Sequence, residues 1–306
     1  MPGHRTEIHH ADIMNTRMSV HLMYSDDDDA AANIIRHCGL DPQSLPQENV
    51  STFFNELRAY EAILSPFRAD SAISRLREGL ALPEAVQTVP LPAGTELGPA
   101  AVVVEIEHLC QSVRELTRGR FDAWWRGWFD PTGLTKGWAV ERAFNQHLTP
   151  MLGAEPALAA AGVYAGGDIR VATCAGADWQ WGIGVEDPFD RQALLATFNL
   201  ADGAVATSGP AARGAHIIDP ATARPVATTG SNATVSATVV AASLDQADLW
   251  ATTAVVAGFD HLDWLEQART LAGVLVAGDG RVKSWQGTTV TQPKSPTPAS
   301  LPTLAM

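Results

Sequence analysis

The chain has 306 residues, with an apolar fraction of 46% and a charged fraction of 18%, ordinary values for a globular protein with a large core. Its formal net charge of −13 argues against nucleic-acid binding, which requires a basic surface. The same charge repels an anionic ligand such as a nucleotide. A nucleotide site would therefore require a metal ion or local hydrogen-bond donors.

The three cysteines, Cys38, Cys110 and Cys174, are far apart in the sequence and form no CxxC pair. This usage is typical of a reducing compartment and argues against both a disulfide framework and a zinc site. Residues 1–12 carry charges and histidines without an apolar segment, and no run approaches about 18 apolar residues. We therefore expect a cytoplasmic protein with neither a signal peptide nor a membrane anchor.

The first half of the chain is predicted to be mainly helical, after a strand over residues 14–24. The acidic run 26–29 is interpreted as a solvated helix start rather than as a metal site. Periodic apolar residues predict helices over 50–64 and 100–116, and the prolines between them predict an irregular connection.

The most distinctive stretch is 119–143, where three tryptophans fall within five residues and two aspartates each follow a phenylalanine. Aromatic faces beside a glycine turn, an acid and Lys136 can stack a flat ring and approach a phosphate. A Trp-rich corner of the core, followed by a helix start, explains the same residues equally well. Residues 135–148 are predicted to be helical, which puts Lys136 near a helix N-terminus, where anions are favoured.

The second half of the chain is predicted to be rich in strands. Paired glycines within 163–171 suggest a β-bulge or a close backbone approach to a ligand. A helix is predicted over 245–257, and the Pro-, Ser- and Thr-rich residues 286–306 are predicted to form a disordered tail. The remaining predicted strands lie at 179–185, 194–200, 204–207, 216–219 and 234–242, with a final hairpin around 278–280.

Early helices followed by a mainly antiparallel sheet indicate an α+β fold and not a repeating βαβ one. We expect a single domain over residues 1–285. The chain has no GxGxxG after a strand and no Walker A motif, so the usual dinucleotide and P-loop folds are not supported.

Two pairs of residues could carry chemistry. Asp248 and Thr252 lie one turn apart on the predicted helix and could reach one Mg²⁺, although this spacing is common in ordinary amphipathic helices. His216 with Asp219 could supply a general base, and the alternative is a strand histidine before an Asp-Pro turn. Ser208 is not in a GxSxG elbow, so a Ser-His-Asp triad is a poor interpretation.

Taken together, the motifs resemble the flavin transferase family, the FAD:protein FMN transferases of the ApbE type, over roughly residues 14–282. Eight short segments occur in the order typical of that family, although each one alone is weak. They are Met14-Asn15-Thr16, Leu64 to Ser71, Gly119-Arg120-Phe121-Asp122, Asp130 to Val140, Gly166-Gly167-Asp168, Ala206 to Gly209, His216 to Pro220 and Asp248 to Thr252.

The resemblance implies an ApbE-type, T-fold-like fold and a Mg²⁺-dependent transfer of FMN from FAD to a Thr or Ser of a target flavoprotein, with release of AMP. It implies metal positions at Gly133, Asp248 and Thr252 with Ala251 beside them, and His216 as base, with Asp219 next to it in the motif. The positions that it matches to FAD contacts are Met14, Phe67, Arg120, Phe121, Asp122, Asp130, Lys136 and Ile218.

The chain departs from the family pattern in a few places. Asn15 replaces a glycine, the turn after the His-Asp motif reads Thr222-Ala-Arg-Pro225, and only seven residues separate Asp122 from Asp130. These features indicate a compact form, and no lipoprotein signal is expected. A Mg²⁺-dependent FAD pyrophosphatase and a non-catalytic FAD-binding protein remain alternative functions.

Overall fold

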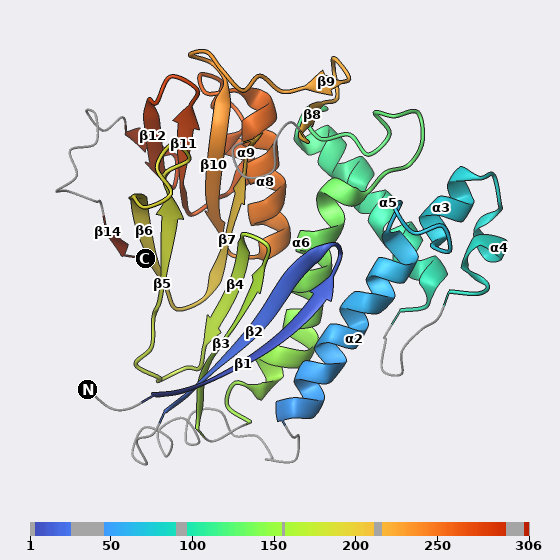
Figure 1. Cartoon of the computed structure of the whole chain (residues 1–306), viewed down its shortest axis with the longest axis horizontal. Helices are drawn as coiled ribbons and strands as arrows, with labels where there is room; N and C mark the ends of the chain where they lie inside the picture. Colours follow the sequence, from blue (N-terminus) through green and yellow to red (C-terminus); the bar gives the residue numbers. More distant parts are fainter. Residues whose placement is uncertain are drawn as a thin grey trace. The chain divides into compact units, whose positions relative to one another are not determined.

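The computed structural model in Figure 1 describes residues 4–25, 46–89, 97–154, 157–210, 216–291 and 303–305. These residues form two compact units. The first contains the residues up to Ile106 together with Trp138–Gln180, and the second contains Glu107–Gly137 and the residues from Trp181 onward. The acidic run 26–29 and Cys38 lie outside the described residues.

The first unit contains a meander of four antiparallel strands in the order β1-β2-β3-β4. Met14 and Asn15 join the first two strands, and both have a left-handed backbone, with φ of 53° and 56°. A two-residue hairpin turn of this type needs positive φ at both positions, which asparagine tolerates well. Asn15 is therefore suited to a turn in which the family pattern has glycine. The strands are β1 (His4–Ile13), β2 (Thr16–Ser25), β3 (Leu158–Ala165) and β4 (Asp168–Thr173).

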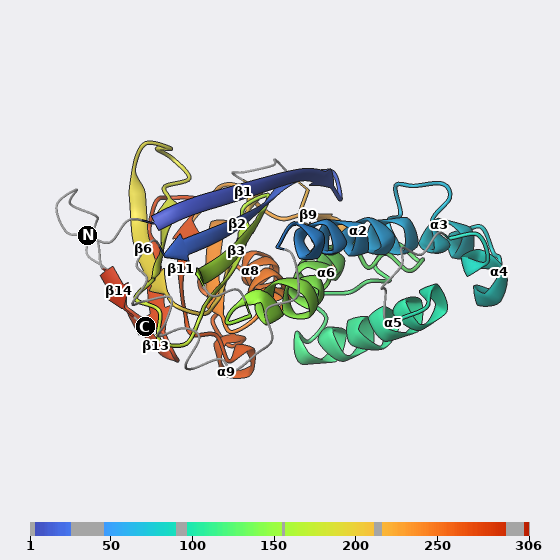
Figure 2. The same ribbon diagram turned by 90° about the horizontal axis from the view of Figure 1, so that it is seen from below.

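Helix α2 (Pro46–Leu64) packs against β1, and Figure 2 shows α3 (Ala72–Arg77) and α4 (Leu82–Val86) beyond its C-terminal end. Inside this unit, Glu56 on α2 is only 2% exposed. Its carboxylate accepts a hydrogen bond from Tyr60 and pairs with His147 of the π-helical turn η1 (Phe144–Leu148). Buried carboxylates require such partners. The pair therefore ties α2 to the end of α6.

The remaining helices of the middle of the chain are α5 (Pro99–Leu116), α6 (Thr132–Ala143) and the short η2 (Thr149–Met151). Leu134 and Thr135 begin the hydrogen-bonded ladder of α6 by donating to the Pro131 carbonyl. Pro131 itself lacks an N–H and is well suited to a helix start.

The second unit is built on five antiparallel strands in the order β7-β10-β11-β12-β13. All residues of β10 are buried, and α8 packs along β7 and β10 (Figure 1). A separate three-stranded sheet has the order β14-β6-β5, and β8 pairs with β9. The elements of this unit are β5 (Trp181–Glu186), β6 (Leu194–Leu200), β7 (Gly203–Ser208), β8 (Ile218–Asp219), β9 (Arg224–Pro225), β10 (Thr234–Ala241), α8 (Leu244–Ala257), α9 (Leu265–Ala268), β11 (Ala272–Ala277), β12 (Val282–Gln286), β13 (Thr289–Thr291) and β14 (Thr303–Ala305).

Three buried tryptophans pack together in the second unit's core. Trp264 stacks on Trp250 at 5.9 Å between ring centroids and meets Trp285 edge-on at 5.5 Å. The Trp285 indole donates to Thr270 Oγ1 at 3.0 Å, which satisfies its buried N–H. The linker between α8 and α9 is therefore anchored at Trp264.

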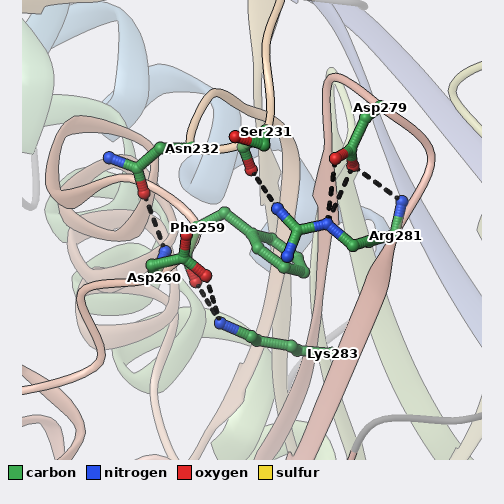
Figure 3. Close-up of polar contacts among 7 residues, drawn as sticks. All are labelled: Ser231, Asn232, Phe259, Asp260, Asp279, Arg281 and Lys283. Atoms are coloured by element: carbon green, nitrogen blue, oxygen red, sulfur yellow. Dashed lines mark hydrogen bonds and ion pairs between the residues drawn. The ribbon is translucent and has the colours of Figure 1, made fainter.

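The same linker is anchored a second time at Phe259 and Asp260 (Figure 3). Lys283 is only 5% exposed, and its ammonium donates to the Phe259 carbonyl at 2.8 Å and to Asp260 at 3.0 Å. The side-chain oxygen of Asn232 accepts from the Asp260 N–H at 2.9 Å. Charge-assisted bonds of this kind hold the linker between these two anchor points firmly in place.

The α+β prediction is confirmed, and the predicted helices over 50–64, 100–116 and 245–257 are present as α2, α5 and α8. Strand β1 was not predicted. The paired glycines do not form a bulge, since Gly166 and Gly167 are the turn of the β3–β4 hairpin, with φ of 63° and 108°. The boundary between a single domain and a tail at residue 285 stays a prediction.

Candidate active site

The candidate site begins where α6 begins. The side chain of Asp130 lies just before the helix, and its Oδ1 accepts hydrogen bonds from the backbone N–H of Thr132, at 3.2 Å, and from the Thr132 hydroxyl. This is helix capping, which satisfies backbone donors that the helix leaves unpaired. The other carboxylate oxygen of Asp130, Oδ2, lies 3.8 Å from the Arg126 guanidinium nitrogen Nη1. The residue predicted to contact FAD therefore also orders the first turn of α6.

Helices α6 and α8 approach each other very closely at Gly137. A Cβ at this position would lie 3.0 Å from the Asp248 Cβ, 3.0 Å from the Leu244 carbonyl and 3.1 Å from the Asp245 Cα. Only glycine allows two backbones to come this near without displacement. The contact brings the adjacent Lys136 into range of α8.

Two pairs of polar side chains involve α8. Lys136 Nζ lies 3.8 Å from Asp248 Oδ2, with side chains that are 21% and 12% exposed. One turn further along α8, the Thr252 hydroxyl is 2.9 Å from the Ser208 hydroxyl at the end of β7. The structure thus brings together a cation, a carboxylate and two hydroxyls in one compact unit.

A further carboxylate lies one turn before Asp248. Asp245 Oδ1 is buried and has no hydrogen-bond partner among the described residues. An unpaired buried carboxylate oxygen is costly and calls for an explanation, such as an ion. This role could not be predicted from the sequence, because an acid in the first turn of a helix is explained by the helix dipole alone.

The oxygen atoms on this side of α8 are the kind of ligands that a hard divalent cation prefers. Mg²⁺ takes oxygen ligands and is usually held by one or two carboxylates together with waters and substrate phosphates. Asp248, Thr252 and the unpaired oxygen of Asp245 supply oxygen ligands of this kind on successive turns of α8. Within the part of the chain that the structure describes, no three His, Cys, Asp or Glu side chains gather into a complete metal site. A cation here would depend on its substrate for further ligands.

Arg120 is held by a carboxylate. Its two terminal nitrogens donate to Asp263 at 3.0 and 2.9 Å, and Arg118 approaches the same carboxylate at 3.4 Å. The hydrogen bond from Arg120 is the main cause that lowers the pKa of Asp263. Asp263 lies on the linker between its anchors at Asp260 and Trp264, so Arg120 is bound to a fixed partner.

The other residues of the 119–133 stretch take part in local structure. Phe121 is 7% exposed, and a Cβ at Gly133 would lie 3.1 Å from its ring. Asp122 accepts from the Trp124 N–H at 2.8 Å and pairs with Arg114 at 3.1 Å. These contacts agree with both interpretations of the stretch, the ring-binding site and the core corner.

His216 and the β8 residues lie in the second unit as well. His216 is exposed, and Ile218 is half-buried in β8. Both carboxylate oxygens of Asp219 accept local bonds, from the Ala221 N–H at 2.9 Å and the Thr222 hydroxyl at 3.0 Å. Asp219 thus forms the turn that is expected of an aspartate before proline. The fully buried Ala251 lies beside Thr252 on α8.

Two predicted contacts for FAD belong to the first unit. Met14 lies in the β1–β2 turn, and its N–H donates to Glu61 at 2.9 Å. Phe67 follows α2 and is 80% exposed, which is unusual for a large aromatic side chain. The fourteen predicted site residues are therefore divided between the units, with Met14 and Phe67 in the first and the others in the second.

No helix among the described residues is long and apolar enough to cross a membrane. No curated protein gives a significant sequence match to the chain. A family model described as the ApbE family matches residues 126–275, a range that includes Lys136, Ser208, Asp248 and Thr252.

Solved structures share the fold. The flavin transferase ApbE from Vibrio cholerae is 18% identical with a TM-score of 0.63, covering 93% of this chain and 97% of its own. The ApbE protein from Thermotoga maritima is also 18% identical with a TM-score of 0.63, and the match covers 91% of this chain and 96% of that one. The apo form of the flavinyl transferase ApbE from Pseudomonas stutzeri is 18% identical with a TM-score of 0.61, and the match covers 95% of each chain. This shared fold confirms the expected ApbE-type fold, and the family-model match over residues 126–275 supports the resemblance to the ApbE family.

Proposed function

We propose that this protein transfers FMN from FAD to a Thr or Ser hydroxyl of a target flavoprotein, in a Mg²⁺-dependent reaction that releases AMP. The observation that carries the proposal is the ion pair of Lys136 with Asp248, one turn before Thr252 on α8, inside the region matched by the family model. A cation beside oxygen ligands is what a pyrophosphate and its metal ion require. The flavin transferases with the same fold support the same activity.

In the proposed reaction the target hydroxyl oxygen attacks the phosphorus of the FMN half of FAD. A phosphoester bond forms to the target, the bond from this phosphorus to the oxygen bridging to AMP breaks, and AMP leaves with that oxygen. The hydroxyl proton passes to a base. Positioning and charge neutralisation supply most of the rate enhancement in such phosphoryl-type transfers.

The residues that would hold Mg²⁺ are Asp248, Thr252 and the Gly133 carbonyl, with Ala251 next to Thr252 in the chain and the unpaired oxygen of Asp245 as a further ligand on α8. When bound, Mg²⁺ would neutralise charge on the pyrophosphate oxygens. Lys136 adds a positive charge beside the proposed metal ligand Asp248. This charge would attract the FAD pyrophosphate, which the net charge of −13 otherwise repels. The proposed FAD contacts are Met14, Phe67, Arg120, Phe121, Asp122, Asp130, Lys136 and Ile218.

His216 is the better of the two candidate bases. It is exposed and so accessible to a protein hydroxyl, whereas both oxygens of Asp219 already accept hydrogen bonds in their own turn. A general base must reach the proton that it removes. We therefore assign proton transfer to His216 and the ordering of its loop to Asp219.

The partner that this function requires is a target protein with an acceptor Thr or Ser. We also propose a cytoplasmic location, supported by the absence of a disulfide pattern in the sequence and by the burial of the Cys110 and Cys174 thiols.

The test is incubation of the purified protein with FAD and a candidate FMN-binding domain, with and without Mg²⁺. We expect flavin fluorescence on the denatured target and release of AMP, both dependent on Mg²⁺. AMP without labelled target would instead indicate an FAD pyrophosphatase, and FAD binding without AMP would indicate a non-catalytic binding protein.

A further inference from the structure

The Asp248 carboxylate has a counter-ion of the protein's own. Its Oδ2 lies 3.8 Å from Lys136 Nζ, and both side chains are largely withdrawn from solvent. This distance is too long for a hydrogen bond, which ends near 3.2 Å for nitrogen and oxygen. The attraction between these two groups is therefore mainly one of charge, and separating them breaks no hydrogen bond between them.

A backbone contact between the two helices places Lys136 within reach of Asp248. Gly137 brings α6 against α8, with its Cβ position 3.0 Å from the Asp248 Cβ. Lys136 is the adjacent residue and cannot move far from α8 while this contact persists. The backbone of Lys136 therefore stays beside α8 in any state that preserves the Gly137 contact, while its side chain can still turn.

A divalent cation that binds Asp248 would meet the ammonium at the same carboxylate. Two cations at one carboxylate repel each other, and the lysine must turn away for the metal to bind well. The FAD pyrophosphate offers the ammonium an anionic partner in place of Asp248, in a chain whose net charge is otherwise strongly negative.

We propose that Lys136 acts as an exchangeable counter-ion of Asp248, so that the divalent cation and FAD bind cooperatively. This inference rests on the proposed function, because it takes Asp248 as a metal ligand and FAD as substrate. Lys136 neutralises Asp248 in the empty site and neutralises the pyrophosphate in the filled one. By linkage, the cation then raises the affinity for FAD by the same factor as FAD raises the affinity for the cation.

The experiment measures binding of Mn²⁺, as a spectroscopic substitute for Mg²⁺, to the full chain by electron paramagnetic resonance, with and without FAD and with no target protein present. In Lys136→Met the carboxylate has no competing cation. We expect Mn²⁺ without FAD to bind about tenfold more tightly than to the wild type, within the usual range of coupling between sites.

The factor by which FAD strengthens Mn²⁺ binding should fall by a similar amount in Lys136→Met. Some enhancement should remain, since the pyrophosphate itself offers oxygen ligands. Arg142→Met is the matched control, because Arg142 is on the same helix, is similarly exposed and pairs with Glu105 instead of Asp248. It removes the same charge and should leave Mn²⁺ binding within about twofold of the wild type, the change expected of a screened charge at a distance.

Asp248→Asn separates failure of this inference from failure of the proposed function. If Asp248→Asn loses Mn²⁺ binding while Lys136→Met binds Mn²⁺ with the affinity of the wild type, the counter-ion role is overturned. The assignment of Asp248 as a metal ligand then still stands. Unchanged Mn²⁺ binding in Asp248→Asn would overturn the metal assignment itself. If the wild type binds Mn²⁺ too weakly to measure without FAD, measurable binding by Lys136→Met supports the inference and equally weak binding contradicts it.

Discussion

Substitution of Gly137 by alanine tests the contact on which the candidate site is built. The new Cβ would lie 3.0 Å from the Leu244 carbonyl and 3.1 Å from the Asp245 Cα, and both are backbone atoms that move only if α8 moves. Replacing glycine by alanine inside a helix contributes up to about 1 kcal/mol of stability. Overpacking of a rigid contact costs about 1–3 kcal/mol. We expect overpacking to win, with a net loss of about 1 kcal/mol.

The effect on activity should be larger than the effect on stability. A displacement of α6 from α8 shifts Lys136 relative to the proposed metal ligands on α8, and misplacement by about 1 Å can cost on the order of 100-fold in rate. Urea denaturation measures the free energy of unfolding, and Mg²⁺-dependent AMP release from FAD measures the activity.

Gly98→Ala is the matched control for this prediction. Gly98 precedes α5, and nothing lies within 4 Å of its Cβ position. The control should retain both stability and activity. A Gly137→Ala protein with unchanged stability and unchanged AMP release would refute the reasoning, because it would mean that the helices do not need this close approach.

Four further predictions concern the surroundings of the site. Asp263→Asn removes the carboxylate that holds Arg120, a proposed FAD contact. The variant should raise KM for FAD several-fold in steady-state assays while kcat changes little, and Asp263→Glu should restore most of the affinity for FAD. Lys283→Met leaves the Phe259 carbonyl without its charged donor and should lower the free energy of unfolding by about 2 kcal/mol in urea titrations; a stable variant would mean that the bond contributes nothing. Asn15→Ala should cost about 1 kcal/mol in thermal unfolding, because alanine is strained at a φ of 56°, whereas Asn15→Gly should be nearly neutral. Burial raises the pKa of the Cys110 thiol to about 12, so the native protein should resist iodoacetamide at this residue at pH 8, and mass spectrometry would reveal any modification.

The periodic elements could be predicted from the sequence because burial gives them a clear pattern. Helix α2 has apolar residues at helical spacing that are buried in the structure, such as Phe53, Leu57 and Ile63. Strand β10 is buried along its full length, which accounts for its continuous run of small and β-branched residues. Strand β1 has mostly exposed and half-exposed residues, including Glu7 and His9, so no hydrophobic pattern marked it.

The contacts of the site could not be derived from local patterns. Lys136 and Asp248 are far apart in the sequence, and only the Gly137 approach brings their helices together. The resemblance to a family had placed both residues in one site, but it said nothing about their resting ion pair. Asp245 was missed because its position in the first turn of α8 already has an ordinary structural explanation.

The most direct test of the account is the intact mass of a candidate target domain after incubation with this protein, FAD and Mg²⁺, in parallel with Asp248→Asn. The account predicts that the wild type increases the mass of the target by one FMN less one water, and that Asp248→Asn, folded by circular dichroism, does not. Equal modification by both proteins would contradict the central role of Asp248, as would modification that persists when a chelator removes the divalent cation.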